Sequence, residues 1–366
     1  KPTLDLFQLR GNLNVWFYNK FRIFYDNRAA FYEIKYLKSI IDDNSEIHVV
    51  SENLDQSIFK GKNIRISKAH RTEDKSRKNI FTVLKYALVF IYRVLISNKS
   101  NFSKRETLLL FQFSSERKIA SKTNPESIEL LNGYWSYLEE EYGNEFGYIE
   151  DMPFPSLIKK FKPTSRMFKV NYPRTFTNEY ILFKSFLSKD TNNSIRQDGQ
   201  NLSKNLKFLQ SKLIEPEDLL ITNHFIRLKS ISNLYIRKFH SFDLFFKRTK
   251  NIKSILAYGE NLSQSKITLD SAKKNGIKTY GLQHGIIRPY NVGYSLSPLE
   301  ASIKPMPDVT LVWGDYWKKQ LIANAHYKPE AIKIVGQPRT DIVPTIKMKY
   351  NEDSKLVSFF SQLQPD

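Results

Sequence analysis

The sequence predicts an α/β protein built on a doubly wound parallel sheet. Three observations support this fold class: apolar runs of strand length recur along the chain, helical segments separate them, and each run ends in polar residues or glycine. Strands that alternate with helices of this length form βαβ units with right-handed crossovers. The carboxyl ends of the strands then share one edge of the sheet, where such Rossmann-like folds bind their ligands.

The first third of the chain already alternates between helix and strand. Residues 12–43 carry apolar and aromatic side chains at helical intervals, and the β-branched run at 46–53 predicts a strand. A weaker strand signal follows at 62–67, and an apolar helix is expected near 84–96. The run ETLLLFQFSSER, residues 106–117, predicts a buried strand.

Residues from about 121 to 215 are predicted to form an inserted helical region. Segments 126–143, 178–190 and 201–215 show helical spacing of their apolar residues. Among them, the polar stretch SKDTNNSIRQDGQNLSK at 188–204 predicts an exposed, mobile loop. We therefore expect this region to lie outside the sheet.

A regular series of strands follows this region. Five apolar runs with polar or glycine-containing ends predict strands at residues 218–224, 254–260, 277–285, 308–315 and 331–341. Helical segments at 263–276 and 315–325 lie between the later runs. This rhythm is the main reason for expecting a parallel sheet.

The ends of these strands carry residues that are suited to chemistry. The candidate site residues at or near them are Asn223, His224, Glu260, Gln283, His284, Gly285, Arg288, Arg339 and Asp341. We expect Glu260 and His284 to end neighbouring strands, where a carboxylate can orient an imidazole and raise its basicity. Either of the two is equally suited to act alone as a catalytic base. The other residues are candidates for substrate binding, and Arg339 offers a planar fork that suits carboxylate or phosphate.

Structural roles compete with these functional ones. A lone histidine is more often a hydrogen-bonded structural residue, although the place of His284 at a strand end, before a glycine, favours function there. Arg339 and Asp341 are equally suited to pair with each other and stiffen a linker. These alternatives stay open at the level of sequence.

Composition restricts the partners that the chain is suited to bind. Its 366 residues suffice for two domains or one elaborated domain. The net charge of +20, from 57 Lys and Arg against 37 Asp and Glu, predicts an anionic partner. There is no cysteine, and the six histidines lack the spacing of metal ligands, so we expect neither disulfides nor a metal site.

Among anionic partners, nucleic acid is disfavoured because the basic residues are spread along the chain without a nucleic-acid-binding motif. An anionic membrane surface, a nucleotide-activated substrate or an acidic polysaccharide fits better. Residues 79–97 approach the length of a membrane span but contain Lys85 and Arg93. They predict either a buried helix or an amphipathic helix in the plane of a membrane. The first residues show no signal-peptide pattern, so we expect a cytoplasmic protein.

Several common enzyme motifs are missing from the sequence. Neither GxGxxG nor GxxxxGK[ST] occurs, which argues against a dinucleotide-dependent dehydrogenase and a P-loop ATPase. There is also no GxSxG nucleophile elbow.

An ordered run of motifs from residue 254 onwards does resemble a known family. The run is YGE…AKKNGIKTYGLQHG…PDVTLVWGDYWKKQL…IKIVGQPRTD…KLVSFFSQLQPD. It resembles the capsule and surface-polysaccharide biosynthesis proteins of the GT-B glycosyltransferase type. It is also similar to the related fold of UDP-N-acetylglucosamine 2-epimerases.

The resemblance implies two Rossmann-like domains that face a cleft, with acceptor binding on the first and nucleotide-sugar binding on the second. Residues 1–345 would form the acceptor-side domain. Residues 346–366 would be the linker and first strand of the second domain, which this chain carries only in part. The resemblance places His284 in the cleft as the base with Glu260 beside it, and Arg339 and Asp341 near the domain junction.

By the same resemblance, the function would be inverting, metal-independent transfer of a sugar to an anionic glycan acceptor. The nucleotide sugar is then a substrate, and no cofactor is required. The protein would work in the cytoplasm, with the inner face of the plasma membrane as a candidate site of attachment. Alternatives are a non-catalytic carbohydrate-binding or scaffold protein of the same fold, a 2-epimerase-like enzyme, and a CDP-glycerol glycerophosphotransferase-like enzyme. The oligomeric state is not predicted.

Overall fold

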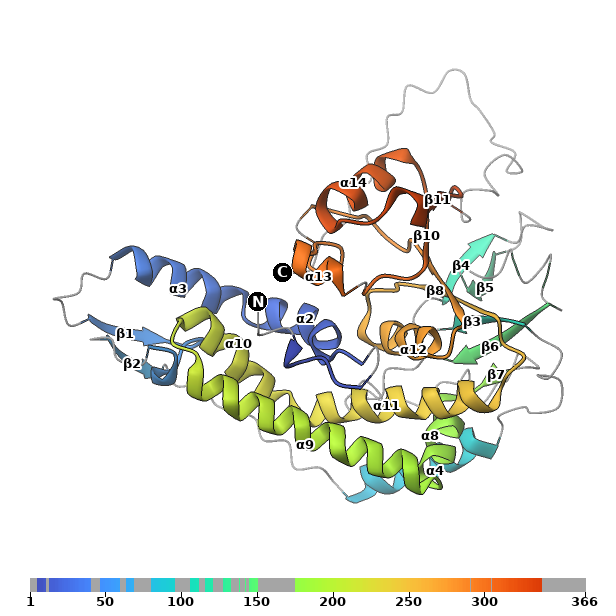
Figure 1. Ribbon diagram of the computed structural model, residues 1–366, viewed down its shortest axis with the longest axis horizontal. Coiled ribbons are helices and arrows are strands. Elements are labelled where there is room, and N and C mark those ends of the chain that lie inside the picture. The colour runs from blue at the N-terminus through green and yellow to red at the C-terminus, as the bar shows by residue number, and fades with distance from the viewer. Residues whose placement is uncertain are drawn as a thin grey trace.

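A parallel sheet and a long helical arm make up the described part of the molecule (Figure 1). The computed structural model describes residues 5–10, 13–40, 47–59, 64–68, 80–95, 106–111, 116–120, 128–132, 138, 142, 145–150, 175–289, 291–303 and 305–337. In Figure 1 the sheet lies at one end, and helices α9, α10 and α11 extend away from it towards α3, β1 and β2.

Among the described residues, seven strands form the main sheet in the order β11-β10-β9-β8-β3-β6-β7, and every neighbouring pair is parallel. Its strands are β3 (Thr107–Phe111), β6 (Phe146–Glu150), β7 (Thr175–Phe176), β8 (Ser254–Tyr258), β9 (Lys278–Leu282), β10 (Val309–Val312) and β11 (Ile332–Ile334). Two small sheets accompany it: parallel β1 (Ile47–Ser51) with β2 (Ile64–Lys68), and antiparallel β4 (Glu116–Ala120) with β5 (Ile128–Asn132).

The order of the strands defines where the chain reverses its direction of travel across the sheet. From β3 the chain moves outward through β6 and β7, and it then returns to the other side of β3 and adds β8 to β11 in sequence. This is the order of a doubly wound sheet, with its switch point between β3 and β8. The parallel α/β architecture predicted from the sequence is confirmed.

Helices cover the sheet and build the arm. The helical elements are α2 (Val15–Asp26), α3 (Arg28–Ile40), η1 (Gln56–Phe59), α4 (Ile80–Leu95), α8 (Asn178–Phe186), α9 (Lys189–Lys212), α10 (Pro216–Arg227), α11 (Lys229–Arg248), α12 (Ser263–Lys274), α13 (Pro298–Ser302), α14 (Asp315–Ala325) and η4 (Pro329–Ala331). The described residues include no helix that combines the length and the apolar character needed to cross a bilayer.

The predicted strand at 218–224 is wrong, because these residues lie in helix α10. Pro216 occupies the first turn of this helix, where proline is favoured since its missing N–H has no role there. Leu219, Leu220 and Phe225 are buried from positions that helical periodicity explains. A short apolar run is ambiguous by itself, and tertiary burial decided for the helix.

The region 121–215 also differs from its prediction. Instead of a loop at 188–204, the structure has the 24-residue helix α9, whose buried Leu202, Leu206 and Leu209 form a narrow apolar stripe. Ser188 caps this helix by accepting a hydrogen bond from the Thr191 amide. Residues 128–132 form strand β5 instead of a helix, and β6 and β7 belong to the main sheet. The region is therefore not a purely helical insertion.

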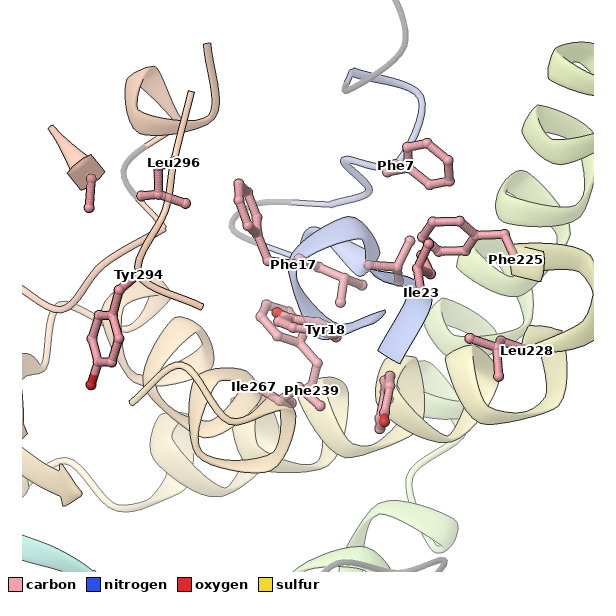
Figure 2. Packing of buried hydrophobic residues seen from close by; sticks show 14 of the residues in the cluster. Phe7, Phe17, Tyr18, Ile23, Phe225, Leu228, Phe239, Ile267, Tyr294 and Leu296 are labelled. Atoms are coloured by element: carbon pink, nitrogen blue, oxygen red, sulfur yellow. The ribbon is translucent and has the colours of Figure 1, made fainter. Parts of the chain in front are cut away.

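Helix α2 lies at the centre of the largest hydrophobic cluster, between the arm and the residues that follow β9 (Figure 2). Phe17 points from α2 towards Leu296, whereas Tyr18 points towards Phe239 of α11. Phe225 stacks on Phe7, with 4.4 Å between the ring centroids. These contacts join segments that lie far apart in the sequence.

Three lysines hold one irregular segment against α2 and α12. We call residues 291–303 and 305–307, between β9 and β10, the covering segment. The Lys20 ammonium donates to the Ser295 carbonyl at 2.7 Å, Lys266 donates to the Pro305 carbonyl, and Lys273 donates to the Met306 carbonyl at 2.9 Å. Because Lys20 and Lys266 are buried, these hydrogen bonds are needed to offset the loss of their hydration.

Lys20 also forms a buried ion pair with Glu300, with 2.8 Å between Nζ and Oε1. The indole of Trp16 donates to the same carboxylate at 2.8 Å. Burial lowers the pKa of Lys20, although Glu300 opposes this change. Burial alone would raise the pKa of Glu300, but hydrogen bonds from Lys20 and Trp16 outweigh it and lower that pKa.

We expect Lys20→Met to lower the free energy of unfolding by about 3–5 kcal/mol, because it leaves the Glu300 carboxylate buried without its cation. The double variant Lys20→Met/Glu300→Met should recover part of this loss, since it removes both charges but not the need of Trp16 and the Ser295 carbonyl for hydrogen-bond partners. Urea unfolding at neutral pH measures both values. A single variant as stable as the original chain would contradict the role given to this pair.

Candidate functional site

The candidate site lies where strands β8 and β9 leave the sheet. The two strands are neighbours, and Tyr258 pairs in register with Leu282. After β8 the chain turns at Gly259, whose φ of 65° favours glycine, and reaches Glu260. An ideal Cβ on Gly259 would lie 3.6 Å from Cε1 of His284. The structure thus places the His284 ring against the backbone next to Glu260, as expected for two neighbouring strands.

Glu260 is enclosed, with 3% of its surface exposed. Its side chain crosses Gly281 so closely that a Cβ there would lie 2.9 Å from the Glu260 Cδ and also from a Pro307 carbon. Burial raises the pKa of Glu260 to about 7, while its own backbone, Tyr294 and Lys266 act in the opposite direction. A carboxyl group with this pKa is partly ionised at neutral pH, as general acid–base catalysis requires.

Gln283 is fully buried and serves the fold around His284. Its side-chain Oε1 accepts from the Trp313 amide at 2.9 Å, and its Nε2 donates to the Gly285 carbonyl at 2.9 Å. Gln283 therefore connects the end of β9 to the end of β10 by a hydrogen bond and stabilises the loop that begins at His284. His284 itself is half-buried, and Arg288 is exposed farther along the same loop.

Asn223 and His224 do not belong to this group. They lie on helix α10, where Asn223 donates to the Ser57 hydroxyl at 3.0 Å and His224 lies 3.5 Å from the Asp26 carboxylate. Burial lowers the pKa of His224, while Asp26 has the opposite effect. Their placement at a strand end is therefore wrong, since the segment is helical. Predicted site residues Arg339 and Asp341 lie outside the described residues.

Two cavities adjoin the covering segment. A small one of about 30 Å³ is lined by Glu260 and Lys266, and a larger one of about 560 Å³ lies between α2, α10 and the covering segment. Lys20 and Val292 line both cavities. The larger cavity has the volume of a small-molecule site. Its lining is Phe7, Trp16, Lys20, Phe24, Leu213, Asp218, Ile221, Thr222, Pro289, Val292, Ser295, Ser297 and Glu300.

The sequence pattern does not mark Trp16, Lys20 or Glu300, which line the larger cavity, as site residues. One local signal was available, because Ser297 and Glu300 form a capping box at the start of α13. That pattern predicts a helix start, but it does not reveal that Glu300 also meets α2. In the part of the chain that the structure describes, no three His, Asp or Glu side chains gather in a way that could hold a metal ion.

Comparisons with known proteins give one relative and no family. No protein-family model matches the chain, and no solved structure matches it. The chain is 23% identical over 278 residues to uncharacterized protein MJ1060 of Methanocaldococcus jannaschii. The match covers 71% of this chain and 50% of that protein, so the chain spans about half the length of this curated relative. The name of this relative states no activity.

We expect Gly281→Ala to destabilise the protein by about 1–3 kcal/mol, because the new methyl group would overlap Glu260 and Pro307. Gly285→Ala is the matched control, since a Cβ at Gly285 meets no atom within 4 Å. Thermal or urea unfolding of both variants tests this. Equal stability of the two variants would show that Glu260 does not pack across Gly281.

The raised pKa of Glu260 predicts a pH-dependent stability. The unfolded carboxyl ionises near 4.5 and the folded one near 7, so its contribution to stability is lost as the pH rises through this range. Relative to the original chain, Glu260→Gln should gain up to ~3 kcal/mol between about pH 5 and about pH 8.

Glu300→Gln provides the control of opposite sign. The pKa of Glu300 is lowered in the folded protein, so its contribution is lost only as the pH falls below the ordinary glutamate range. Titration of Glu300 itself therefore adds no pH dependence to this difference over the same neutral range. A constant difference for Glu260→Gln would contradict the raised pKa of Glu260.

Proposed function

We propose that this chain is the acceptor-side part of an inverting, metal-independent glycosyltransferase of the GT-B type. Its substrate would be a nucleotide sugar, and its acceptor a glycan of a bacterial surface polysaccharide. The supporting observation is that Glu260 and His284 follow adjacent strands β8 and β9 at their carboxyl ends, where the His284 ring lies near the Gly259 backbone. In a doubly wound sheet, this edge is the place where ligands bind.

His284 is the candidate base because it is half-buried, whereas Glu260 is enclosed. In the proposed reaction, the imidazole takes the proton of an acceptor hydroxyl as its oxygen attacks the anomeric carbon of the donor sugar. The bond from that carbon to the nucleotide phosphate breaks on the opposite face, and the nucleotide leaves with the electron pair. Glu260, when ionised, would stabilise the imidazolium by its charge.

The cavity of about 560 Å³ is the candidate place for the part of the acceptor that does not react. It combines the aromatic Trp16 and Phe24 with the polar Ser295 and Ser297, which is the mixed lining typical of small-molecule sites. The net charge of +20 suits both an anionic glycan and a nucleotide sugar.

A non-catalytic carbohydrate-binding protein is the second candidate. The observation that favours it is that two polar residues at the strand ends have structural surroundings. Gln283 uses its side-chain hydrogen bonds to bind the backbone of Trp313 and Gly285, and Glu260 is enclosed. Such a protein would bind glycans without releasing a nucleotide. A 2-epimerase-like enzyme would instead release a free sugar, and a CDP-glycerol glycerophosphotransferase-like enzyme would consume CDP-glycerol.

The test uses this chain, and any longer product that its gene encodes, with a panel of nucleotide sugars, CDP-glycerol and glycan acceptors. We expect release of a nucleotide with formation of a glycosidic product, both measured by mass spectrometry. His284→Ala should lower kcat/KM by about a hundredfold or more, as expected for loss of a general base. His48→Ala is the control, because His48 is exposed on β1, far along the chain from His284, and its ring hydrogen-bonds with the Ser67 hydroxyl of β2.

Turnover that survives His284→Ala unchanged would remove His284 from the mechanism. Glycan binding without nucleotide release by either protein would favour the carbohydrate-binding alternative. A free sugar or consumption of CDP-glycerol would identify one of the other two enzyme types and overturn the transferase proposed above.

A further inference from the structure

Near its C-terminal end, helix α4 buries an arginine and exposes apolar side chains. Arg93 is 1% exposed and pairs with buried Glu179 of α8, with 2.9 Å between Nε and Oε1. Leu88, Ile91 and Leu95 are 68%, 53% and 76% exposed. Their spacing of three and four residues places them on one face of α4, opposite Arg93. An apolar stripe therefore points away from the protein while a guanidinium is buried beneath it.

Helix α8 extends this apolar surface beyond α4. Glu179, Phe183 and Phe186 follow one another at intervals of four and three residues, so they share one face of α8. Phe183, Phe186 and the next residue, Leu187, are all exposed. The face that holds α4 through Glu179 thus continues as exposed aromatic and aliphatic side chains.

A basic groove adjoins this surface. The groove lies between α9 and α11, and its volume is about 670 Å³. Its cations are Arg196, Lys204, Lys207, Lys229 and Arg237, and no carboxylate lines it. Among the described residues, none of these five side chains forms an ion pair.

Arg237 connects the groove to the apolar surface. Its guanidinium lies over the ring of Phe186, 4.5 Å from the centroid, and it donates to Asn192 at 3.3 Å. Asn192 in turn donates to the Phe186 carbonyl at 2.9 Å. Contacts of α8 thus join α4, through Arg93 and Glu179, to the basic groove, through Phe186 and Arg237, and we treat the exposed sides of these elements as one composite surface. Figure 1 shows α4 and α8 beside the ends of α9 and α11.

We propose that this surface, which we call the α4–α9 face, binds the surface of an anionic lipid bilayer. The apolar stripe would enter the boundary between headgroups and acyl chains, and the groove cations would attract anionic headgroups. An interfacial protein needs these two components together, since apolar area and attraction to anionic lipid both contribute to binding.

Charge and composition favour an anionic bilayer over a nucleic acid or a second copy of the chain. A nucleic acid would use the cations but would leave Leu88, Ile91 and Leu95 in water. A second copy of the chain would bring its own basic groove to the contact, and the like charges would repel. A bilayer with anionic lipids is complementary to both parts. The proposal does not depend on the transferase activity.

The absence of cysteine from the sequence allows a site-specific test. Leu88→Cys and Leu95→Cys are labelled with a polarity-sensitive dye and mixed with vesicles of equal parts phosphatidylcholine and phosphatidylglycerol. We expect a blue shift of the emission for both positions. Tyr32→Cys is the matched control, because Tyr32 is equally exposed on a helix, α3, outside the proposed face. Its dye should not shift.

A flotation assay with the same vesicles tests the two components of the face separately. We expect Leu88→Asp/Leu95→Asp to lower vesicle binding by roughly tenfold or more. Lys204→Glu/Lys207→Glu should lower it by a similar factor. The charge-matched control Lys328→Glu/Lys333→Glu changes exposed lysines elsewhere and should bind normally. Binding of the original chain should weaken from ~0.1 M to ~1 M salt.

The following results would overturn the proposal. One is failure of the original chain to float at low salt. Another is a blue shift at positions 88 and 95 without vesicles that grows with protein concentration, because this would identify a second copy as the occupant. Binding to single-stranded RNA that Lys204→Glu/Lys207→Glu abolishes, without vesicle binding, would assign the groove to nucleic acid instead.

Discussion

The covering segment keeps its position through hydrogen bonds between lysine side chains and its own backbone carbonyl oxygens. Lys20 on α2 and Lys266 and Lys273 on α12 bind the carbonyls of Ser295, Pro305 and Met306. A buried ammonium without acceptors would be costly, so the segment and the two helices must be placed together. The packing of Phe17 and Tyr18 in the largest cluster then follows from the same placement of α2 (Figure 2).

The chemistry available at the strand ends depends on this arrangement. Pro307 of the covering segment packs close to Gly281, and Glu260 fills the remaining space beside that glycine. The carboxylate therefore loses its hydration, and its pKa rises to about 7. Lys266 both binds the segment and acts on the pKa of Glu260, so the fold and the electrostatics of the site are coupled through one side chain.

The strands that carry the site could be predicted because buried parallel strands read as short apolar runs with polar ends. Glu260 and His284 followed from that pattern alone. The errors arose where this local signal is weak. The run at 218–224 fits either a helix or a strand, and the few leucines of α9 are widely spaced among polar residues. The contact of Trp16 with Glu300 joins residues 284 positions apart, which no local pattern can reveal. Leu88, Ile91 and Leu95 show helical spacing, but the burial of Arg93 beneath them depends on Glu179 of another helix.

Helix α11 links the α4–α9 face to the sheet without a flexible joint. Its first half contributes Lys229 and Arg237 to the basic groove, and its second half places Phe242 and Phe246 in the cluster that contains Ile255 of β8. Because α11 is a continuous helix of 20 residues, its two halves keep a fixed orientation relative to each other. A bilayer bound at the groove would therefore fix the direction in which the ends of β8 and β9 face. An acceptor anchored in that bilayer would be presented to His284 from a constant side, and binding would need no rearrangement of the sheet to achieve this.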